Sequence, residues 1–261
     1  MPELPEVEHA AGVLRRASRG KTVARVVGFH PSFRKRLPGP RAKLAKDKRV
    51  LKVERHGKHQ VMTLDGDVVV VAHFRLDGDW ELGSSEDTPS RFARGAIEFT
   101  DGTRISLVDP RALATLTVHR AAESYLPALG PDPTSKDLDV DAVCAALGRR
   151  AIPIKQALLD QKVLAGVGNI YAAEALWRAG IDPRVAAKSL SRKRCEGLLD
   201  ALRVVLADGD RASARYRTAG NSRIQMYGNE GKPCPNCETP IRRITQGTRS
   251  TWFCPSCQTR R

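Results

Sequence analysis

Cys234-Pro235-Asn236-Cys237 and Cys254-Pro255-Ser256-Cys257, separated by 16 residues, decide how the last part of this chain folds. Each Cys-x2-Cys pair can occupy a tight turn that directs two sulfurs toward one ion. Four thiolates complete a tetrahedron and leave no open position, so we expect one structural Zn²⁺. Two disulfides are the alternative, which we disfavour because the chain carries no secretion signal.

The residues between the two pairs form an alternating run that turns at Gly247. Residues 241–253 hold three arginines: Arg242, Arg243 and Arg249. A β-hairpin that presents basic side chains to DNA fits this run. A zinc ribbon that contacts another protein is the competing interpretation.

The charge of the chain points to a polyanionic partner. Lys and Arg total 44 against 29 Asp and Glu, which gives a net charge of +15 and a pI near 10.0. Nucleic acid is the first partner to consider and an anionic membrane surface the second. No apolar run approaches the ~20 residues that a membrane span needs, so we expect a cytoplasmic protein that associates with the nucleoid and not with a membrane.

The rest of the chain divides into a part with strand-like sequence patterns and a part with helix-like patterns. A helix is predicted over residues 3–18, followed by alternating, strand-like segments from residue 22 to residue 108. This half predicts an antiparallel β-sandwich or barrel with a leading helix. After a Gly- and Pro-rich segment at 129–133, which we interpret as a linker, residues 137–208 favour helices. Cys144 and Cys195 stand apart in two of these helices, where we expect them to be buried apolar residues.

The chain begins Met1-Pro2-Glu3-Leu4-Pro5-Glu6-Val7-Glu8. Removal of Met1 would expose the secondary amine of Pro2, and an α-amino group with a pKa of ~7.7–8.0 is partly neutral and nucleophilic near pH 7. Its attack on a sugar C1′ would give an iminium ion directly. The carboxyl group of Glu3 could transfer protons beside it, although Glu3 could also simply favour the start of the helix.

The start, the middle and the end of the chain together resemble the formamidopyrimidine-DNA glycosylase and endonuclease VIII family. The matching motifs are Pro2–Glu8, Gly166-Val167-Gly168-Asn169-Ile170-Tyr171-Ala172-Ala173-Glu174 and the four-cysteine ribbon with Arg249–Cys254. They occur in the family's order, so the resemblance covers essentially the whole chain. It implies an α+β fold with three domains: the β-sandwich at 1–128, a helix-two-turn-helix domain at 129–228 and the zinc hairpin at 229–261.

The resemblance also implies roles for single residues. Pro2 would be the Schiff-base nucleophile, and Glu3 the acid/base for base loss and sugar-ring opening. Lys58 would contact phosphate and assist β-elimination, and Arg249 would bind phosphate and promote δ-elimination. The remaining basic or polar DNA contacts would be Asn169, Lys155 and Arg150. Simpler alternatives are an ordinary hairpin charge for Lys58, a helix N-cap for Asn169 and a solvated ribbon charge for Arg249.

An enzyme that acts at C1′ takes the nucleotide out of the stack and fills the gap. The family positions for this task fall on Leu76, Arg111 and Leu113, where two leucines replace the family's methionine and phenylalanine. Leucine can still act as an apolar wedge, and plain core packing is the alternative. Phe92 stands near a family histidine that contacts DNA, a contact that Arg91 or Arg94 could replace.

The segment at 210–223 is several residues shorter than the family loop that closes over 8-oxoguanine. A shorter loop leaves the pocket more open. We therefore expect formamidopyrimidines, hydantoins, oxidised pyrimidines and abasic sites to be better substrates than 8-oxoguanine.

The sequence thus predicts a monomeric, bifunctional DNA glycosylase/AP lyase that acts on damaged double-stranded DNA and carries one Zn²⁺. The alternatives are a catalytically weak or inactive paralogue that binds damaged DNA, and a zinc-ribbon transcription or translation factor. The second explains the charge and the cysteines but not the N-terminal motif.

Overall fold

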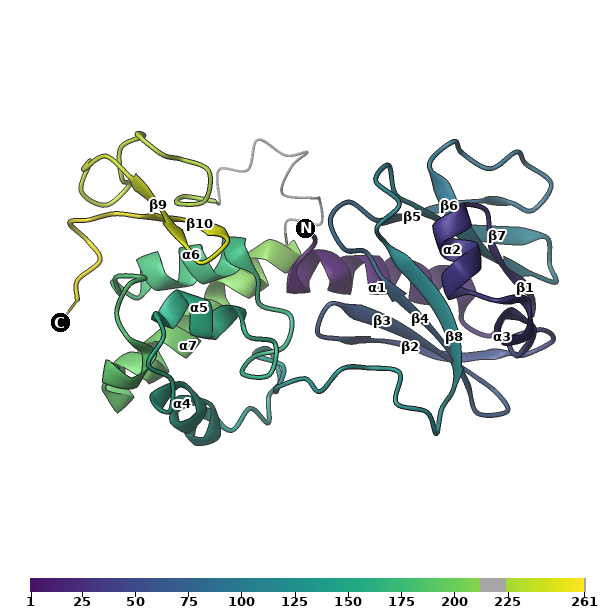
Figure 1. Cartoon of the computed structure of the whole chain (residues 1–261), viewed down its shortest axis with the longest axis horizontal. Helices are drawn as coiled ribbons and strands as arrows, with labels where there is room; N and C mark the ends of the chain where they lie inside the picture. Colours follow the sequence, from purple (N-terminus) through teal and green to yellow (C-terminus); the bar gives the residue numbers. More distant parts are fainter. Residues whose placement is uncertain (212–223, 261) are drawn as a thin grey trace. The chain divides into compact units, whose positions relative to one another are not determined.

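The computed structural model describes residues 1–211 and 224–260, which gather into two compact units (Figure 1). The first unit comprises Met1–Pro2 and Glu6–Pro127, and the second comprises Glu3–Pro5 and Ala128–Arg261. The residues from Glu3 to Pro5 therefore belong with the second unit although they stand at the start of the chain. The division into three domains stays a prediction.

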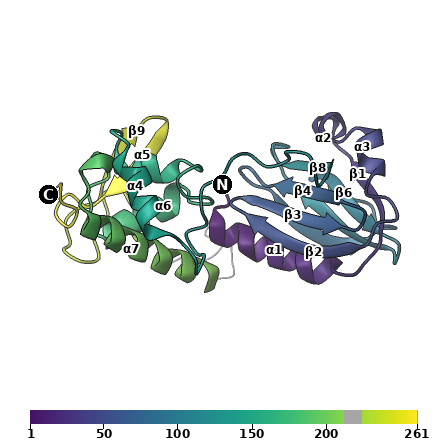
Figure 2. The same ribbon diagram turned by 90° about the horizontal axis from the view of Figure 1, so that it is seen from below.

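The first unit contains one long helix and two four-stranded antiparallel sheets. The helix, α1, spans Leu4–Ser18 and runs alongside β2, where the Arg15 guanidinium donates to the Val53 carbonyl over 3.0 Å (Figure 2). The strand orders are β1-β6-β7-β5 and β2-β3-β4-β8. The strands are β1 (Val23–Gly28), β2 (Val50–His56), β3 (His59–Leu64), β4 (Val68–His73), β5 (Asp79–Ser84), β6 (Ala93–Phe99), β7 (Thr103–Val108) and β8 (Thr115–Arg120).

Strand β4 shows why this sheet forms. Successive side chains of a strand point to opposite faces, and Val68, Val70 and Ala72 enter the main core of the unit. Val69 and Val71 face the other way, where Tyr125 and Leu126 pack against them. Because both faces of β4 are covered, the strand is apolar throughout. The expected leading helix and antiparallel sandwich are confirmed.

Two short helices and two strands of this unit escaped the sequence analysis. They are α2 (Pro31–Arg36), α3 (Gly39–Lys43), β5 and β8. Helix α2 depends on a local cap, since the His30 side chain accepts from the Ser32 amide, and on the buried Phe33. Helices this short carry too few turns to show a periodicity.

The second unit consists of helices and one hairpin. Its elements are α4 (Val140–Gly148), α5 (Ile154–Leu159), α6 (Asn169–Arg178), the 3₁₀-helix η1 (Ala187–Ser189), α7 (Arg192–Arg211), β9 (Arg242–Gln246) and β10 (Arg249–Phe253). Helix α6 packs closely on α7, because a side chain at Gly209 would collide with the ring of Tyr171. The segment at 129–133 is part of this unit: the Gly130 amide donates to Gln161 and the Ala165 amide to Pro131. The split between the two units falls directly before this segment, after Pro127, so the segment interpreted as a linker stands at the start of the second unit and packs on it.

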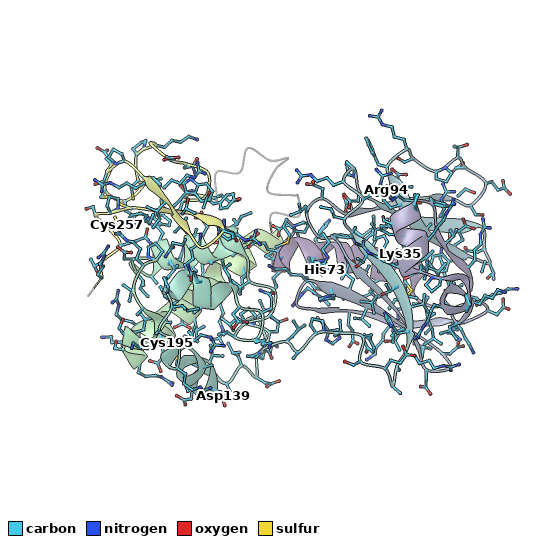
Figure 3. The ribbon with its side chains drawn as sticks, in the orientation of Figure 1. Lys35, His73, Arg94, Asp139, Cys195 and Cys257 are labelled. Carbon is cyan, nitrogen blue, oxygen red and sulfur yellow. A yellow bond between two sulfur atoms is a disulfide. The ribbon has the colours of Figure 1, made fainter. Side chains whose placement is uncertain are left out.

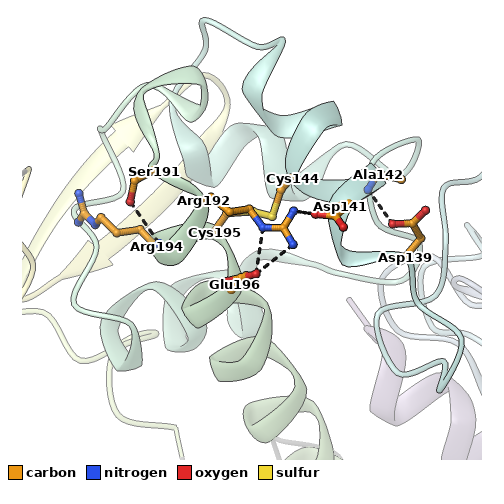
Figure 4. The surroundings of a disulfide bond; sticks show 9 residues. All are labelled: Asp139, Asp141, Ala142, Cys144, Ser191, Arg192, Arg194, Cys195 and Glu196. Carbon is orange, nitrogen blue, oxygen red and sulfur yellow. Dashed lines mark hydrogen bonds and ion pairs between the residues drawn. A yellow bond between two sulfur atoms is a disulfide. The ribbon is translucent and has the colours of Figure 1, made fainter.

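The interpretation of Cys144 and Cys195 as separate apolar residues was wrong. The two form a disulfide that joins α4 to α7, with Cα atoms 5.9 Å apart (Figure 4). Arg192, beside Cys195, bridges the same two helices, since its guanidinium contacts Asp141 and lies 2.9 Å from Glu196. The sequence separation of 51 between the cysteines hides this proximity in the sequence. Among the described residues, no helix is long and apolar enough to cross a bilayer.

Candidate active site

The carboxylate of Glu3 is fixed at the N-terminus of α6. Its two oxygens accept the amides of Ile170, over 3.0 Å, and Tyr171, over 3.2 Å. The Leu4 amide adds a third link by donating to the Gly166 carbonyl over 3.1 Å. Free amides and the helix dipole make a helix N-terminus a site for negative charge. Glu3 is 2% exposed, so this arrangement orients a buried carboxyl group next to Pro2.

The Gly166-x-Gly168 motif has a structural reason that the sequence did not reveal. A Cβ atom at Gly168 would overlap the Glu3 carboxyl group, and Gly166 adopts a φ of +88° against the Leu4 side chain. Both glycines therefore make room for the start of the chain. The amides of Ile170 and Tyr171, at the start of α6, are thereby occupied by Glu3.

Asn169 and Lys155 converge on the zinc hairpin. The side-chain amide of Asn169 donates to the Ser250 carbonyl over 3.1 Å, and the Lys155 ammonium donates to the same carbonyl over 2.8 Å. Lys155 also donates to the Thr251 hydroxyl over 2.7 Å. The N-cap of α6 is Gly168, so the interpretation of Asn169 as a simple N-cap was wrong. The Asn169 Oδ1 atom is buried and has no hydrogen-bond partner in the structure.

Lys155 is 1% exposed. Burial lowers the pKa of its ammonium to about 7, Glu3 opposes this shift, and the charge of Arg249 adds to it. The side chain thus ties α5 to β10 from inside the unit. A direct contact of Lys155 with DNA stays a prediction that this burial does not favour.

Arg249 opens β10, and its side chain is exposed next to the turn at Gly247, where φ is +58°. Arg150, by contrast, is engaged within the unit, because its guanidinium donates to the Asp160 carboxylate over 3.0 Å and to the Ala146 carbonyl over 2.5 Å. Of these two arginines, only Arg249 offers a guanidinium on an exposed hairpin.

The four cysteines of the two Cys-x2-Cys pairs come together behind the hairpin. Their sulfurs all lie within 4.8 Å of one another, close to the ~3.8 Å between sulfurs expected for tetrahedral zinc with Zn–S bonds of ~2.3 Å. Met226 and Ile241 are buried beside them, with Trp177 and Trp252 packed against the cluster. The four ligands are Cys234, Cys237, Cys254 and Cys257, and they hold one structural zinc ion.

Lys58 follows Gly57 in the turn between β2 and β3 and is 7% exposed. The interpretation as an ordinary solvated charge was therefore wrong. His59 and His73 lie next to it on paired strands, with ring centroids 4.6 Å apart. Burial, followed by the charges of His59, Arg75 and Lys58, lowers the pKa of His73 to about 3. Both imidazoles are neutral at pH 7, because burial also lowers the pKa of His59.

The three expected gap-filling residues lie in two loops of the first unit. Leu113 is 42% exposed, so core packing does not explain it. The Arg111 side chain is 53% exposed, and its guanidinium lies 2.7 Å from the Asp77 carboxylate. Leu76, in the same loop as Asp77, is half-buried.

Glu174 is a residue whose role the sequence analysis missed. Its buried carboxylate accepts the amides of Gln225, Met226 and Tyr227 over 2.9–3.0 Å. Burial raises the pKa of this carboxyl group, and the three hydrogen bonds oppose the shift. The position of Glu174 at the end of the 166–174 motif was the available signal. Glu174 thus fixes the backbone of residues 225–227. Most of the short segment at 210–223 lies outside the described residues.

A buried carboxylate held at a helix N-terminus and a basic hairpin backed by four cysteines are the features expected of one class of protein, the zinc-bearing DNA glycosylases with a helix-two-turn-helix. Comparisons with known proteins place the chain within this class. Residues 1–116 match the formamidopyrimidine-DNA glycosylase N-terminal domain, residues 129–216 the formamidopyrimidine-DNA glycosylase H2TH domain, and residues 231–260 the zinc finger found in FPG and IleRS. The chain belongs to the formamidopyrimidine-DNA glycosylase family.

Whole relatives agree with this assignment. The formamidopyrimidine-DNA glycosylases of Gluconobacter oxydans and Streptomyces coelicolor are 36% and 37% identical, and each alignment covers 99% of this chain and at least 98% of the relative. The crystal structure of MutM (Fpg) from Thermus thermophilus matches with a TM-score of 0.86 at 35% identity, over 98% of both chains. Lactococcus lactis formamidopyrimidine-DNA glycosylase, bound non-covalently to DNA with an AP site, matches with a TM-score of 0.89 at 26% identity, over 98% of this chain and 99% of that chain.

The family and its relatives make this chain a bifunctional DNA glycosylase and AP lyase for oxidised bases. A paralogue without catalytic activity is not favoured. The zinc-ribbon transcription or translation factor is excluded, because the matches extend over the whole chain.

Proposed function

We propose that this enzyme uses Pro2 as its nucleophile and Glu3 as its proton-transfer group. The observation that carries the proposal is the fixation of the Glu3 carboxylate by two amides of α6. Because Glu3 directly follows Pro2, a rigid Glu3 also restricts where the Pro2 nitrogen can lie. The motif that binds Glu3 is the one that the sequence analysis assigned to DNA contacts.

The reaction then follows from the chemistry of a secondary amine. The Pro2 nitrogen bonds to C1′, the glycosidic bond breaks, and the departing base takes a proton from water. Glu3 accepts the proton that the Pro2 nitrogen loses and donates it to the sugar-ring oxygen as the ring opens, and the nitrogen becomes an iminium ion. This cation accepts electrons, so loss of a C2′ proton expels the 3′ phosphate, and loss of a C4′ proton then expels the 5′ phosphate.

The charged residues of both units support the strand cleavage. Lys58 is a buried amine in its hairpin, directly before His59, which suits one phosphate contact and β-elimination. Arg249 is the exposed guanidinium of the zinc hairpin and suits a second phosphate contact and δ-elimination. Asn169 supplies an amide that lies next to this hairpin.

The substrate is double-stranded DNA with an oxidised base or an abasic site. The short segment at 210–223 supports a preference for formamidopyrimidines, hydantoins and oxidised pyrimidines over 8-oxoguanine. The net charge of +15 supports binding to nucleoid DNA, and we propose that the enzyme acts there as a monomer.

Borohydride trapping tests the proposed nucleophile. The protein, with Met1 removed, is mixed with a duplex that contains an abasic site, and the iminium ion is reduced. We expect a covalent protein–DNA adduct for the processed chain and none for a matched protein that keeps a tag in front of Met1. Absence of an adduct from the processed chain would refute the chemistry.

A further inference from the structure

The loop between β7 and β8, residues 109–114, carries two of the gap-filling residues and is fixed from within by one carboxylate. Asp109 is fully buried. Its oxygens accept the amides of Arg111 over 3.0 Å and of Leu113 and Ala114 over 2.7 Å each. Ala112, between these amides, has a φ of +53°. A side chain keeps this left-handed backbone only where the surroundings impose it.

A second group holds the start of the same loop. Arg94, on β6 and labelled in Figure 3, donates to three backbone carbonyls. These are the carbonyls of Asp109 over 2.5 Å, Pro110 over 3.1 Å and Arg91 over 3.3 Å. All three guanidinium nitrogens are thereby used. The expectation that Arg94 contacts DNA in place of a histidine does not fit this arrangement.

A third group holds the end of the loop. Arg36, in the last turn of α2, donates to the carbonyls of Leu113 over 3.4 Å and Ala114 over 3.2 Å. Ser32, on the same helix, donates to the Ala112 carbonyl over 3.4 Å. Helix α2, which the sequence did not reveal, thus serves as a support for the loop.

The result is a loop whose backbone is held while its side chains face solvent. Leu113 is 42% exposed, and Arg111 is linked to the neighbouring loop through Asp77. In that loop Arg75 also adopts a left-handed backbone, with a φ of +55°. A segment that is ordered before it binds avoids the entropy cost of becoming ordered on the DNA.

We propose that Arg94 and Arg36 are positioning residues that hold the 109–114 loop so that Arg111 and Leu113 can enter the gap left by the extruded nucleotide. This inference rests on the proposed function and adds to it the residues that preform the gap-filling loop. Neither guanidinium needs to touch DNA for this task. For Arg94 the planar fork, and not only the charge, is required, because its three nitrogens donate to three carbonyls at once. Arg36 donates to both of its carbonyls from Nη1.

The substitution Arg94→Lys tests the proposal because it keeps the charge and removes the fork. The matched control is Arg34→Lys, an exposed arginine of α2 that donates to Gly28, outside the loop. Two substrates are compared, which are a duplex with a formamidopyrimidine opposite cytosine and a single strand with a preformed abasic site. Only the duplex has an opposite base and a gap to fill.

We expect Arg94→Lys to slow single-turnover excision from the duplex by about tenfold, because the competent loop becomes a minor population. Cleavage of the single strand should stay within about twofold of the rate of the unsubstituted enzyme, because this substrate has no gap and its cleavage does not depend on the population of the competent loop. The difference in excision rate between duplexes with different opposite bases should become smaller. The control should leave both rates unchanged.

Equal rates on the duplex for Arg94→Lys and the unsubstituted enzyme would overturn the proposal, as would an equal loss on both substrates. If Arg94→Lys fails to fold, Arg36→Ala carries the same comparison, because it removes both donations of Arg36 to the loop. Failure of this inference is distinct from failure of the proposed function, because borohydride trapping by the unsubstituted chain depends on Pro2 alone.

Discussion

The disulfide between Cys144 and Cys195 gives the prediction with the largest calculable effect. The bond closes a loop across a sequence separation of 51 between α4 and α7. We compare the oxidised protein with the same protein reduced by a phosphine, which does not remove zinc. The matched control is the double variant Cys144→Ala/Cys195→Ala, which cannot form the bond.

The magnitude follows from loop closure in the unfolded chain. For a separation of 51 residues, the loss of chain entropy corresponds to about 4 kcal/mol at 25 °C. We expect reduction to lower the free energy of unfolding of the helical unit by up to about this amount. The melting temperature should fall by roughly 10 °C. The double variant should show no response to the reductant.

Urea unfolding followed by circular dichroism, with and without reductant, measures the difference. A count of free thiols in zinc-stripped, denatured protein checks the starting state. We expect four free thiols among the six cysteines, because the zinc ligands are free once the metal is removed. Six free thiols in protein purified without reductant would show that the bond does not form and would refute the argument.

Four further predictions concern the helical unit and the histidine pair. Glu174→Gln should lower the free energy of unfolding in urea by about 2 kcal/mol, because the single amide oxygen accepts three backbone N–H groups less well than the two carboxylate oxygens do. The control Glu196→Gln, measured in the same way, should lower the free energy of unfolding by less than half as much. The Lys155 pKa is lowered to about 7, so the unfolded chain binds more protons than the folded chain between pH 7 and the usual lysine pKa. The free energy of unfolding of the unsubstituted protein, relative to that of Lys155→Met, should therefore rise with pH over that range. A difference in unfolding free energy that does not change with pH would contradict the lowered pKa. The His73 pKa of about 3 predicts that its contribution to stability is lost as the pH falls from 6.5 toward 3, by at most about 1.4 kcal/mol per pH unit, and His73→Gln should remove this slope. Chelation of the zinc should abolish strand cleavage while the β-sandwich stays folded. Metal analysis measures the zinc content, and circular dichroism measures the fold. Strand cleavage by protein that has lost its zinc would contradict this prediction.

The sequence predicted those features whose cause is local. The spacing of Cys234 and Cys237, and of Cys254 and Cys257, defined the zinc site, because a Cys-x2-Cys turn needs only four residues. The strand-like segments between residues 22 and 108 were visible from their pattern of apolar residues. Helix α2 was not, because six residues held by a His30 cap and one buried Phe33 show no period.

The candidate site was predicted in part. Pro2, Glu3 and the 166–174 motif were singled out, but the contact between Glu3 and the amide of Ile170 joins residues 167 positions apart. No periodicity or propensity reports a contact of that separation. The same reason hid the hydrogen bonds from Lys155 to Ser250, which turned an expected surface contact into a buried tie.

The amino-acid sequence by itself therefore determined the class of fold, the four-cysteine zinc cluster and the family, and it predicted the reactive groups. The tertiary structure alone decided which partner each charged group has: Glu3 with α6, Arg94 and Arg36 with the 109–114 loop, and Cys144 with Cys195. Short-range order is encoded in neighbouring residues, whereas these pairings depend on how distant segments pack, and packing is fixed only when the whole core has formed.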